Sequence, residues 1–531
     1  VSANWLLAAL GTAMLVAPAL QHRGPSPVLA SPRFLALEVD ARPTAEPVAP
    51  AGAVGGSGGS APPAVARGRA WRRCSARFAF AAALPAAALC AGAQRRSRQR
   101  RGQTAIAGAA AGGEVFLGVD FGTSGCRAAC LDAEGRLVAE ASTQYGYGAG
   151  LEEWRSALRE VIQGIPERGS AAAVCINGTS ATALLCDACG APITGPLMYD
   201  HACAAPAVER CREMVPSASH VAAAPTSTLA KVWEWLLDDS VPRGAKLAHQ
   251  ADWLASLLHG SSSVTDYHNA LKLGYDTEAL RWPDWILSDD RVAELLPERV
   301  ATPGETIGEV TAEASSWLGL PQGCRVAAGT TDSIAAFLAA GTSEVGEAVT
   351  SLGTTLAIKL RSRTKVEDAG SGVYSHRLGG GQWLVGGASN SGGAVLRQLF
   401  GDEAVARLSQ EIDPEVASGL DYYPLPSVGE RFPICDAAMQ PRLEPRPSED
   451  GRFLHGVLEG IARIETMGYD RLRELGAGSV TRIATAGGGA KNAVWCRIRE
   501  RLIGVPVTPA SWTQAACGTA MLARQGVSLL G

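Results

Sequence analysis

The sequence predicts an α/β protein whose folded part uses one structural theme twice. Strand-like and helix-like runs alternate from residue 114 onward, which is typical of the α/β class. A strand that leads into an acid and a Gly-hydroxyl turn opens this region at residues 115–125, and a similar pattern returns at residues 326–355. The return of the pattern favours an internal duplication with one acid-and-hydroxyl turn in each half.

The opening segment, VFLGVDFGTSGCR, joins a buried strand to a turn suited to phosphate. The apolar run Val115–Val119 carries Asp120 to the strand end. Gly122, Thr123 and Ser124 then supply backbone N–H groups and hydroxyls that can wrap a polyphosphate, and Asp120 can hold Mg²⁺ through water. A hairpin with a Gly-rich turn and a buried capping Asp is the structural alternative, and this segment alone does not decide between the two.

The elements that follow argue against a dinucleotide-binding unit. Two further strands, Arg127–Asp132 and Leu137–Ser142, continue the opening strand through hairpins before any helix begins, whereas that unit needs strand, glycine loop and helix in succession. Helical periodicity then runs through Glu152–Gly164. A buried strand at Ala172–Asn177 ends in a second polar turn, Gly178–Ser180.

The central segment brings the second acid. A strand at Val326–Gly329 leads to Asp332, which lies among Thr330, Thr331 and Ser333 at the start of a predicted helix. Such an Asp can act as a helix N-cap, as a functional carboxylate, or as both. A strand at Glu347–Thr350 then ends in the turn that contains Gly353, Thr354 and Thr355.

A third glycine-rich turn lies near the end of the chain, between a strand at Arg482–Ala484 and a helix at Trp495–Leu502. Its glycines, Gly487–Gly489, let a flat or anionic ligand lie against the backbone. Tight packing between strand and helix is the alternative explanation of such a loop.

Charge divides the chain into two parts. Residues 1–113 carry 13 Arg, no Lys and three acids, a net charge of +10, while the rest carries −14. The first part consists largely of Ala, Gly, Pro, Ser and Arg, which cannot bury enough apolar area to fold. We therefore interpret it as a targeting leader, and the acidic remainder disfavours a nucleic-acid partner.

Within the leader, the order of its segments predicts a destination. An apolar run at Trp5–Leu20 resembles a signal-peptide core, the Pro, Gly, Ser and Arg stretch after it resembles a transit peptide, and the apolar run Phe78–Ala93 with its following Arg cluster resembles a stop-transfer segment. That order is similar to bipartite plastid presequences. A mitochondrial presequence, an anchored membrane protein or a cytoplasmic location are the alternatives.

The 13 cysteines do not indicate a disulfide framework, because most stand singly in apolar runs. Cys186 and Cys189 form a single C-x-x-C with no second pair and no His at ligand spacing. We expect two unrelated reduced thiols there rather than a zinc site or a redox switch.

Three motifs together resemble those of a known family. The chain is similar to the FGGY carbohydrate kinases in their two phosphate motifs and their adenosine motif, which occur here in the family's order and spacing. The two phosphate motifs correspond to DFGTSGCR and to AAGTTDSIAAFLAAG with SLGTT, and the adenosine motif corresponds to AGGGAKNAVWCRIRERLIGVPV with QAACGTAMLA. The resemblance implies a duplicated actin/hexokinase-like (ribonuclease H-like) ATPase fold with two domains around a central cleft. It implies a sugar-binding domain at residues 114–345 and a nucleotide-binding domain at 346–531.

The resemblance also implies a reaction and its residues. ATP and Mg²⁺ are the expected cofactors and a small sugar the expected partner, with no stable membrane association after leader removal and an oligomeric state open between monomer and homodimer. Asp332 is the expected base, and Asp120, Ser180 and Asp332 are the expected sugar contacts, with Asp120 also on the metal through water. The expected nucleotide contacts are Gly122, Thr123, Ser124, Gly353, Thr354, Thr355, Gly488, Gly489, Asn492 and Trp495, although an aromatic on a helix is more often a core residue.

Three further stretches bear on the identity of the sugar acceptor. The chain looks most like the plant and cyanobacterial pentulose kinase branch in STLAK, HQADWL and DYHNALKLGYD. This resemblance implies D-ribulose ahead of D-xylulose as the acceptor. Other sugar or polyol kinases of the same fold and a non-catalytic actin-like nucleotide-binding protein are the alternatives. HQADWL, at His249–Leu254, either lines the acceptor cleft or forms a buried capped helix.

Three departures from the family pattern limit these expectations. Asn177 stands where related kinases commonly have Asp, and Gln514 stands where they commonly have Glu. The segment Tyr199–Cys203, YDHAC, replaces a more usual YNDAR and so lacks the Arg of one family sugar contact. None of the three removes the base or the nucleotide turns.

Overall fold

The first sheet is centred on β1, all of whose residues are buried. The computed structural model describes residues 113–238 and 241–526, so the predicted leader lies outside the described residues except for Gly113. The strand order is β3 (Leu137–Gln144), β2 (Gly125–Asp132), β1 (Val115–Phe121), β4 (Ala171–Asn177), β10 (Arg325–Ala327) and β9 (Thr306–Glu309). β1 pairs antiparallel with β2 and parallel with β4, and β4 pairs parallel with β10.

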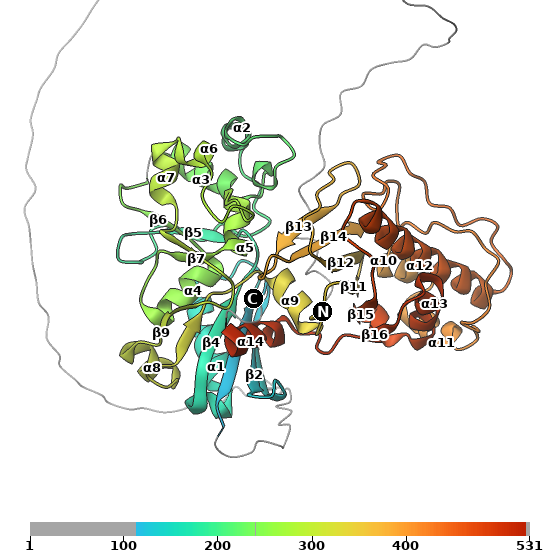
Figure 1. The fold of residues 1–531 in the computed structure, drawn as a ribbon, viewed down its shortest axis with the longest axis horizontal. Coiled ribbons are helices and arrows are strands. Elements are labelled where there is room, and N and C mark those ends of the chain that lie inside the picture. Colours follow the sequence, from blue (N-terminus) through green and yellow to red (C-terminus); the bar gives the residue numbers. More distant parts are fainter. Residues whose placement is uncertain (1–112, 239–240, 527–531) are drawn as a thin grey trace, which may run out of the picture. The chain divides into compact units, whose positions relative to one another are not determined.

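The second sheet has the same central arrangement. Its order is β13 (Tyr374–Arg377), β14 (Trp383–Ser389), β12 (Leu356–Ser362), β11 (Glu347–Leu352), β15 (Arg482–Ala486) and β16 (Val507–Pro509). β11 pairs antiparallel with β12 and parallel with β15, and β15 pairs parallel with β16, which repeats the pattern around β1. The predicted α/β class and internal duplication are confirmed (Figure 1).

The duplication begins later than the sequence pattern suggested. β10 belongs to the first sheet, so Asp332 and its hydroxyl neighbours follow a strand of the first half. The second copy starts at β11, and its turn carries no acid. Ser351 lies two residues before Gly353, at the position that Asp120 holds before Gly122.

Helices cover both sheets. α1 (Leu151–Gln163), α4 (Gln250–His259) and α8 (Ala312–Leu318) share the first hydrophobic core, where Trp154 and Leu158 of α1 are fully buried. The long α12 (Asp450–Glu474) packs on β12 and on α13 (Ala493–Ile503), and α11 (Asp402–Ser409) packs on α12 (Figure 1). The other described helices of eight or more residues are α2 (Ala205–Met214), α3 (Thr228–Leu237), α9 (Asp332–Ala339) and α14 (Ala515–Gln525).

A long insertion between β4 and β10 builds a separate core. This third core joins the strands β5 (Ala183–Cys186) and β6 (Lys246–His249) to α2 and α3. The shorter elements of the insertion are β7 (Val264–Asp266), β8 (Arg299–Ala301), α5 (Tyr267–Ala270), α6 (Asp284–Leu287) and α7 (Asp290–Leu295). Among the described residues, none of the helices combines the length and apolar character needed to cross a bilayer.

The last helix, α14, packs against the first sheet although it follows the second in sequence. A Cβ on Gly118 of β1 would lie 2.1 Å from the Ala520 nitrogen of α14, and a Cβ on Gly518 would lie 1.9 Å from the Ala335 oxygen of α9. Backbone therefore packs directly on backbone at both contacts. The predicted boundary between residues 345 and 346 stays a prediction, and α14 shows that packing does not follow sequence order there.

The contact at Gly118 predicts a stability effect. We expect Gly118→Val to lower the free energy of unfolding by about 3 kcal/mol, because the added side chain must displace α14 or β1. Chemical denaturation of the purified protein measures the change. Gly169→Ala is the matched control, since a Cβ there meets no atom within 4 Å. Equal destabilisation by both variants would contradict this account of the helix contact.

Candidate active site

The ends of three neighbouring parallel strands hold the three residues expected to contact the sugar. Asp120 of β1 is paired with Asn177 of β4, and Ser180 lies just beyond β4. Gly178 forms a parallel bridge with Thr331, and the Asp332 N–H donates to the Gly178 oxygen at 3.0 Å. The structure therefore gathers Asp120, Ser180 and Asp332 at one edge of the first sheet.

Asp120 is buried at the end of β1. Burial raises its pKa to about 6, against the lowering effects of the Arg127 charge and the Asn177 side chain. Among the described residues, no hydrogen-bond partner reaches its Oδ1 atom. An ionised carboxylate with one unused oxygen suits a sugar hydroxyl or a hydrated Mg²⁺, so the residues present fit such an ion.

Asp332 is the first residue of α9 and is also buried. Burial and then the nearby Asp120 charge raise its pKa to about 7. Its Oδ1 accepts a hydrogen bond from the adjacent Ser333 N–H at 2.6 Å, while Thr331 occupies the N-cap position. The helix-cap role considered from sequence is therefore not the one that Asp332 fills. A carboxyl with a pKa near 7 is suited to accept a proton at neutral pH.

Two buried lysines act on Asp332, and the sequence interpretation did not identify either. Lys272 follows α5 in the first half, and Lys359 lies in β12 of the second. Burial lowers the pKa of each to about 8, and the Asp332 charge opposes that lowering in both. Lys272 lies within the motif DYHNALKLGYD. Lys359 lies in no such motif, and its position as an isolated Lys in an apolar strand is the only sequence feature that could have indicated a functional role.

His268 joins these elements through both of its ring nitrogens. Its Nδ1 lies 2.7 Å from the Thr330 hydroxyl, and its Nε2 lies 2.6 Å from the Arg377 oxygen in β13. Burial lowers the pKa of His268 to about 4, so the ring is neutral. Since a carbonyl can only accept, Nε2 donates to Arg377 and Nδ1 accepts from Thr330.

The loop that carries Ser180 is held from two sides. Gln250 Oε1 accepts from the Thr179 backbone N–H at 2.9 Å and lies 3.0 Å from its hydroxyl. Lys231 donates to the Ala181 oxygen at 2.6 Å, and Ala181 has a φ of 69°. A left-handed Ala is strained and persists only where its surroundings hold it, so Gln250 and Lys231 position Ser180.

The other residues of HQADWL form the start of a buried helix. His249 precedes α4, and its backbone N–H and ring Nδ1 lie 3.0 and 2.8 Å from Asp252 Oδ2. Trp253 packs in the first core. The capped-helix interpretation is the one observed, with Gln250 as the residue that reaches the site loop.

The two hydroxyl turns occupy equivalent places in the two sheets. The first turn, with Gly122, Thr123 and Ser124, joins β1 to β2 and is closed by the Gly122 N–H bond to the Gly125 oxygen at 2.9 Å. Tyr145 supports it by donating to the Gly122 oxygen at 2.6 Å.

The second turn, with Gly353, Thr354 and Thr355, joins β11 to β12. It lies against the N-terminus of α10 (Gly393–Leu399), whose Gly393 and Ala394 N–H groups donate to the Gly353 and Thr354 oxygens at 2.9 and 3.0 Å. The predicted pair of phosphate turns is therefore present as a structural pair, and their roles stay predictions.

The glycine loop near the C-terminus packs closely on the second turn. A Cβ on Gly487 would lie 2.6 Å from the Leu352 oxygen, and one on Gly489 would lie 2.6 Å from the Leu352 Cβ atom. At Gly488, by contrast, an added Cβ would meet nothing within 4 Å. Gly488 thus faces open space beside a turn, which fits a ligand lying on the backbone.

Asn492 and Trp495 have structural partners. Asn492 caps α13 by accepting from the Trp495 N–H at 3.0 Å, and its amide donates to the Ser409 hydroxyl at 2.8 Å. Trp495 lies in the second core, where its ring N–H donates to the Leu458 oxygen at 3.2 Å. Its buried ring supports Gly489 and is not available to stack on a base.

Comparison with known proteins agrees with this geometry. Residues 348–525 match the model of the FGGY family of carbohydrate kinases, C-terminal domain. The L-fuculokinase of Salmonella typhi is 25% identical over 444 residues, which cover 74% of this chain and 88% of that protein. The xylulose kinase of Staphylococcus xylosus is 23% identical over 440 residues, which cover 77% and 90%.

Solved structures show the fold. The xylulose kinase from Rhodospirillum rubrum aligns with a TM-score of 0.65 at 23% identity, covering 78% of this chain and 92% of that one. The gluconate kinase from Lactobacillus acidophilus aligns with a TM-score of 0.65 at 20% identity, covering 79% and 90%. These likenesses confirm the expected duplicated actin/hexokinase-like fold.

The raised pKa of Asp332 predicts a pH-dependent stability. In the folded protein this carboxyl holds its proton up to about pH 7, against an ordinary value of 3.8, so its contribution to stability is present at pH 4 and is lost between pH 4 and pH 7. We expect Asp332→Asn to stabilise the protein by about 1–3 kcal/mol at pH 8 and to change little at pH 4. Denaturant unfolding at the two pH values tests this.

Asp421→Asn is the control for that comparison. The Asp421 side chain is 79% exposed and forms a surface ion pair with Arg442. Its replacement should change stability by no more than about 1 kcal/mol at either pH. A stabilising effect of Asp332→Asn that is the same at pH 4 and pH 8 would contradict the assigned pKa.

Proposed function

We propose that this chain is a carbohydrate kinase of the FGGY family that phosphorylates a hydroxyl of a pentulose with ATP. The match of residues 348–525 to the model of the family's C-terminal domain supports this proposal. The observation that carries the proposal is the buried pair Asp120 and Asp332 at one sheet edge. Burial raises the pKa of both carboxyls, to about 6 for Asp120 and to about 7 for Asp332. Asp332 begins α9, whereas Asp120 has one oxygen without a hydrogen-bond partner among the described residues, so the two carboxyls suit different roles.

In the proposed reaction, Asp332 accepts the proton of the sugar hydroxyl while that oxygen attacks the γ-phosphorus of ATP. The new O–P bond forms as the bond to the β-phosphate oxygen breaks, and ADP leaves. Asp120 and Ser180 bind neighbouring sugar hydroxyls. The positive charges of Lys272 and Lys359 favour the ionised form of Asp332.

We assign the nucleotide to the turns of both halves. The backbone N–H groups and hydroxyls of Thr123 and Ser124, and of Thr354 and Thr355, are suited to phosphate oxygens. Gly488 provides the open backbone position for the adenosine. When Mg²⁺ is bound, it neutralises phosphate charge, and the free Oδ1 of Asp120 is the atom that would hold it through water.

The acceptor we favour is D-ribulose, with D-xylulose as the second candidate. D-ribulose is supported by the stretches STLAK and DYHNALKLGYD, whose residues Lys231 and Lys272 lie beside the site loop and Asp332. D-xylulose is supported by the relatives named xylulose kinase. Residues 1–113 support a plastid location for this activity, and the two sheets support a division into a sugar-binding and a nucleotide-binding domain.

A substrate panel tests the activity. We expect ATP consumption by the full chain to rise with D-ribulose most, then D-xylulose, and little with L-ribulose, glycerol, gluconate or L-fuculose. Asp332→Asn should lower kcat about 10²- to 10⁴-fold with nucleotide binding retained, because the base is lost while the turns remain. Nucleotide binding without stimulation by any acceptor would favour the non-catalytic alternative.

The two lysines predict a shift in the pH profile. A base with a pKa of about 7 makes kcat/KM fall about tenfold per pH unit below that value, because the protonated carboxyl cannot accept the hydroxyl proton. Lys359→Met removes a positive charge that lowers the pKa of Asp332, so the acidic limb should move to higher pH. Lys365→Met is the control, since the Lys365 ammonium forms an ion pair with Glu278 and is not among the charges that shift the pKa of Asp332. If the acidic limb of the pH profile stays at the same pH in Lys359→Met, then Lys359 does not influence the pKa of Asp332.

A further inference from the structure

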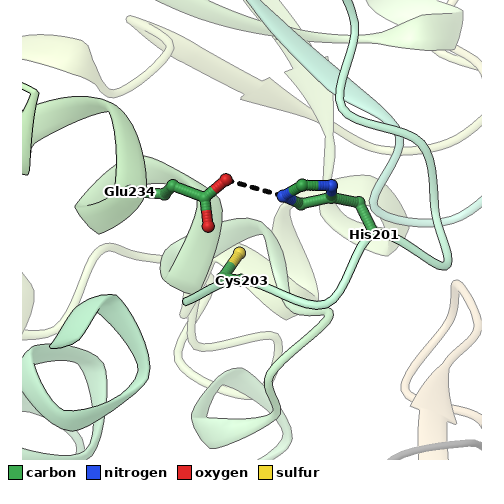
Figure 2. Close-up of side chains that lie close together, drawn as sticks. All are labelled: His201, Cys203 and Glu234. Carbon is green, nitrogen blue, oxygen red and sulfur yellow. Dashed lines mark hydrogen bonds and ion pairs between the residues drawn. The ribbon is translucent and has the colours of Figure 1, made fainter. Parts of the chain in front are cut away.

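Three potential metal ligands of different chemical types converge in the insertion between β4 and β10. One imidazole nitrogen of His201, the Cys203 sulfur and one carboxylate oxygen of Glu234 all lie within 4.8 Å of one another. Figure 2 shows the three side chains pointing toward a common point, from the segment before α2 and from α3. In the part of the chain that the structure describes, this is the one group of three or more such residues whose ligand atoms lie this close together.

The cluster lies where the sequence departs from the family pattern. His201 and Cys203 belong to YDHAC, the segment that replaces the more usual YNDAR. The proposed kinase reaction uses none of the three residues. From the sequence we expect Cys186 and Cys189 to be two unrelated thiols rather than a zinc site, and in the structure Cys186 is buried while Cys189 is exposed. The third ligand, Glu234, lies 31 residues after Cys203 in the sequence. Motifs defined by short ligand spacings therefore do not detect this cluster.

We propose that His201, Cys203 and Glu234 bind Zn²⁺ as a three-ligand site. An imidazole, a thiolate and a carboxylate form a donor set that suits this ion, and hard cations such as Mg²⁺ avoid the sulfur. Tetrahedral Zn²⁺ separates its donor atoms by roughly 3.3–3.8 Å, so donors within 4.8 Å of one another reach it by side-chain shifts of about 1 Å.

Two of the three side chains in the cluster are partly exposed to solvent. Without metal, His201 Nε2 lies 2.6 Å from Glu234 Oε1, and the ion would separate these two atoms. The His201 and Glu234 side chains are 36% and 27% exposed, so water can reach the fourth position, whereas Cys203 is buried. Glu234 Oε2 accepts from the Ala204 N–H at 2.9 Å, which orients the carboxylate from behind.

The charges around the cluster are compatible with a bound Zn²⁺ ion. Lys231 lies one helical turn before Glu234 and donates to the Ala181 and Met198 oxygens at 2.6 and 2.7 Å. A Zn²⁺ ion with one thiolate and one carboxylate has no net charge, so the neighbouring ammonium does not oppose it. Because Lys231 also holds the loop of Ser180, the ion would pin the segment 199–204 to the helix that supports the acceptor side of the site.

Metal titration of the full chain, without a His tag and after chelator treatment, tests the proposal. We expect one equivalent of Zn²⁺ to bind and to raise the thermal unfolding midpoint. Co²⁺ used as a probe should give a thiolate-to-metal charge-transfer band in the near ultraviolet. Cys203→Ser should abolish that band and weaken Zn²⁺ binding on the order of 100-fold, because the sulfur ligand is lost.

Matched variants separate ligation from general effects. Cys189→Ser and Cys435→Ser remove exposed thiols and should leave the band and the affinity unchanged. Should Cys203→Ser fail to fold, as judged by circular dichroism, His201→Asn at a half-exposed position provides the same comparison and should lower affinity while keeping the thiolate band. No band in the wild-type chain, or a band that survives in Cys203→Ser, would overturn the site. The result is independent of the kinase assay.

Discussion

The burial of two like-charged carboxylates side by side is the constraint on which the rest of the site depends. Asp120 and Asp332 are both buried, and the charge of Asp120 adds to burial in raising the pKa of Asp332. Such a pair holds a proton to higher pH than a single carboxyl would, and nearby positive charge opposes this effect. Lys272 and Lys359 supply that charge, and they come from the two different sheet-bearing halves. The electrostatics of the first half are therefore completed by a strand of the second.

The parallel pairing of β1 and β4 holds the pair in place. Because side chains alternate along a strand, a slip of one residue in this pairing would turn Asp120 to the opposite face of the sheet. The seven residues of β1 are all buried. Position 118 has no room for a side chain, because a Cβ there would clash with the backbone of α14. Both features tie the register to the packing of the core. The position of Asp120 is thus fixed by the pairing of β1 with β4 and by the packing of α14 on β1.

Local sequence patterns were sufficient to predict the secondary-structure elements and the turns. They were insufficient to predict the side chains that shift the pKa values of the site carboxyls. Alternating apolar runs and glycine turns predicted β1, β2, β3, β4 and α1 to within a few residues, because each is determined by its own segment. Lys359 could not be assigned in this way, since its neighbour Asp332 lies in the other half of the fold. The surroundings of Trp495 could not be predicted from its own segment either. Whether an aromatic on a helix faces a ligand or a core depends on what packs against it, here Leu458 of α12.

Asn177 shows how a departure from the family pattern can be accommodated. An Asp at this position would place a third buried carboxylate beside Asp120 and Asp332, and it would raise the pKa of Asp120 further. The amide instead lowers the pKa of Asp120, and its Nδ2 donates to the Thr519 hydroxyl of α14. One side chain therefore joins Asp120 to the helix that closes the first sheet. Since α14 follows the whole second half in sequence, the hydrogen bond between Asn177 and Thr519 can form only once the chain has folded to its last helix.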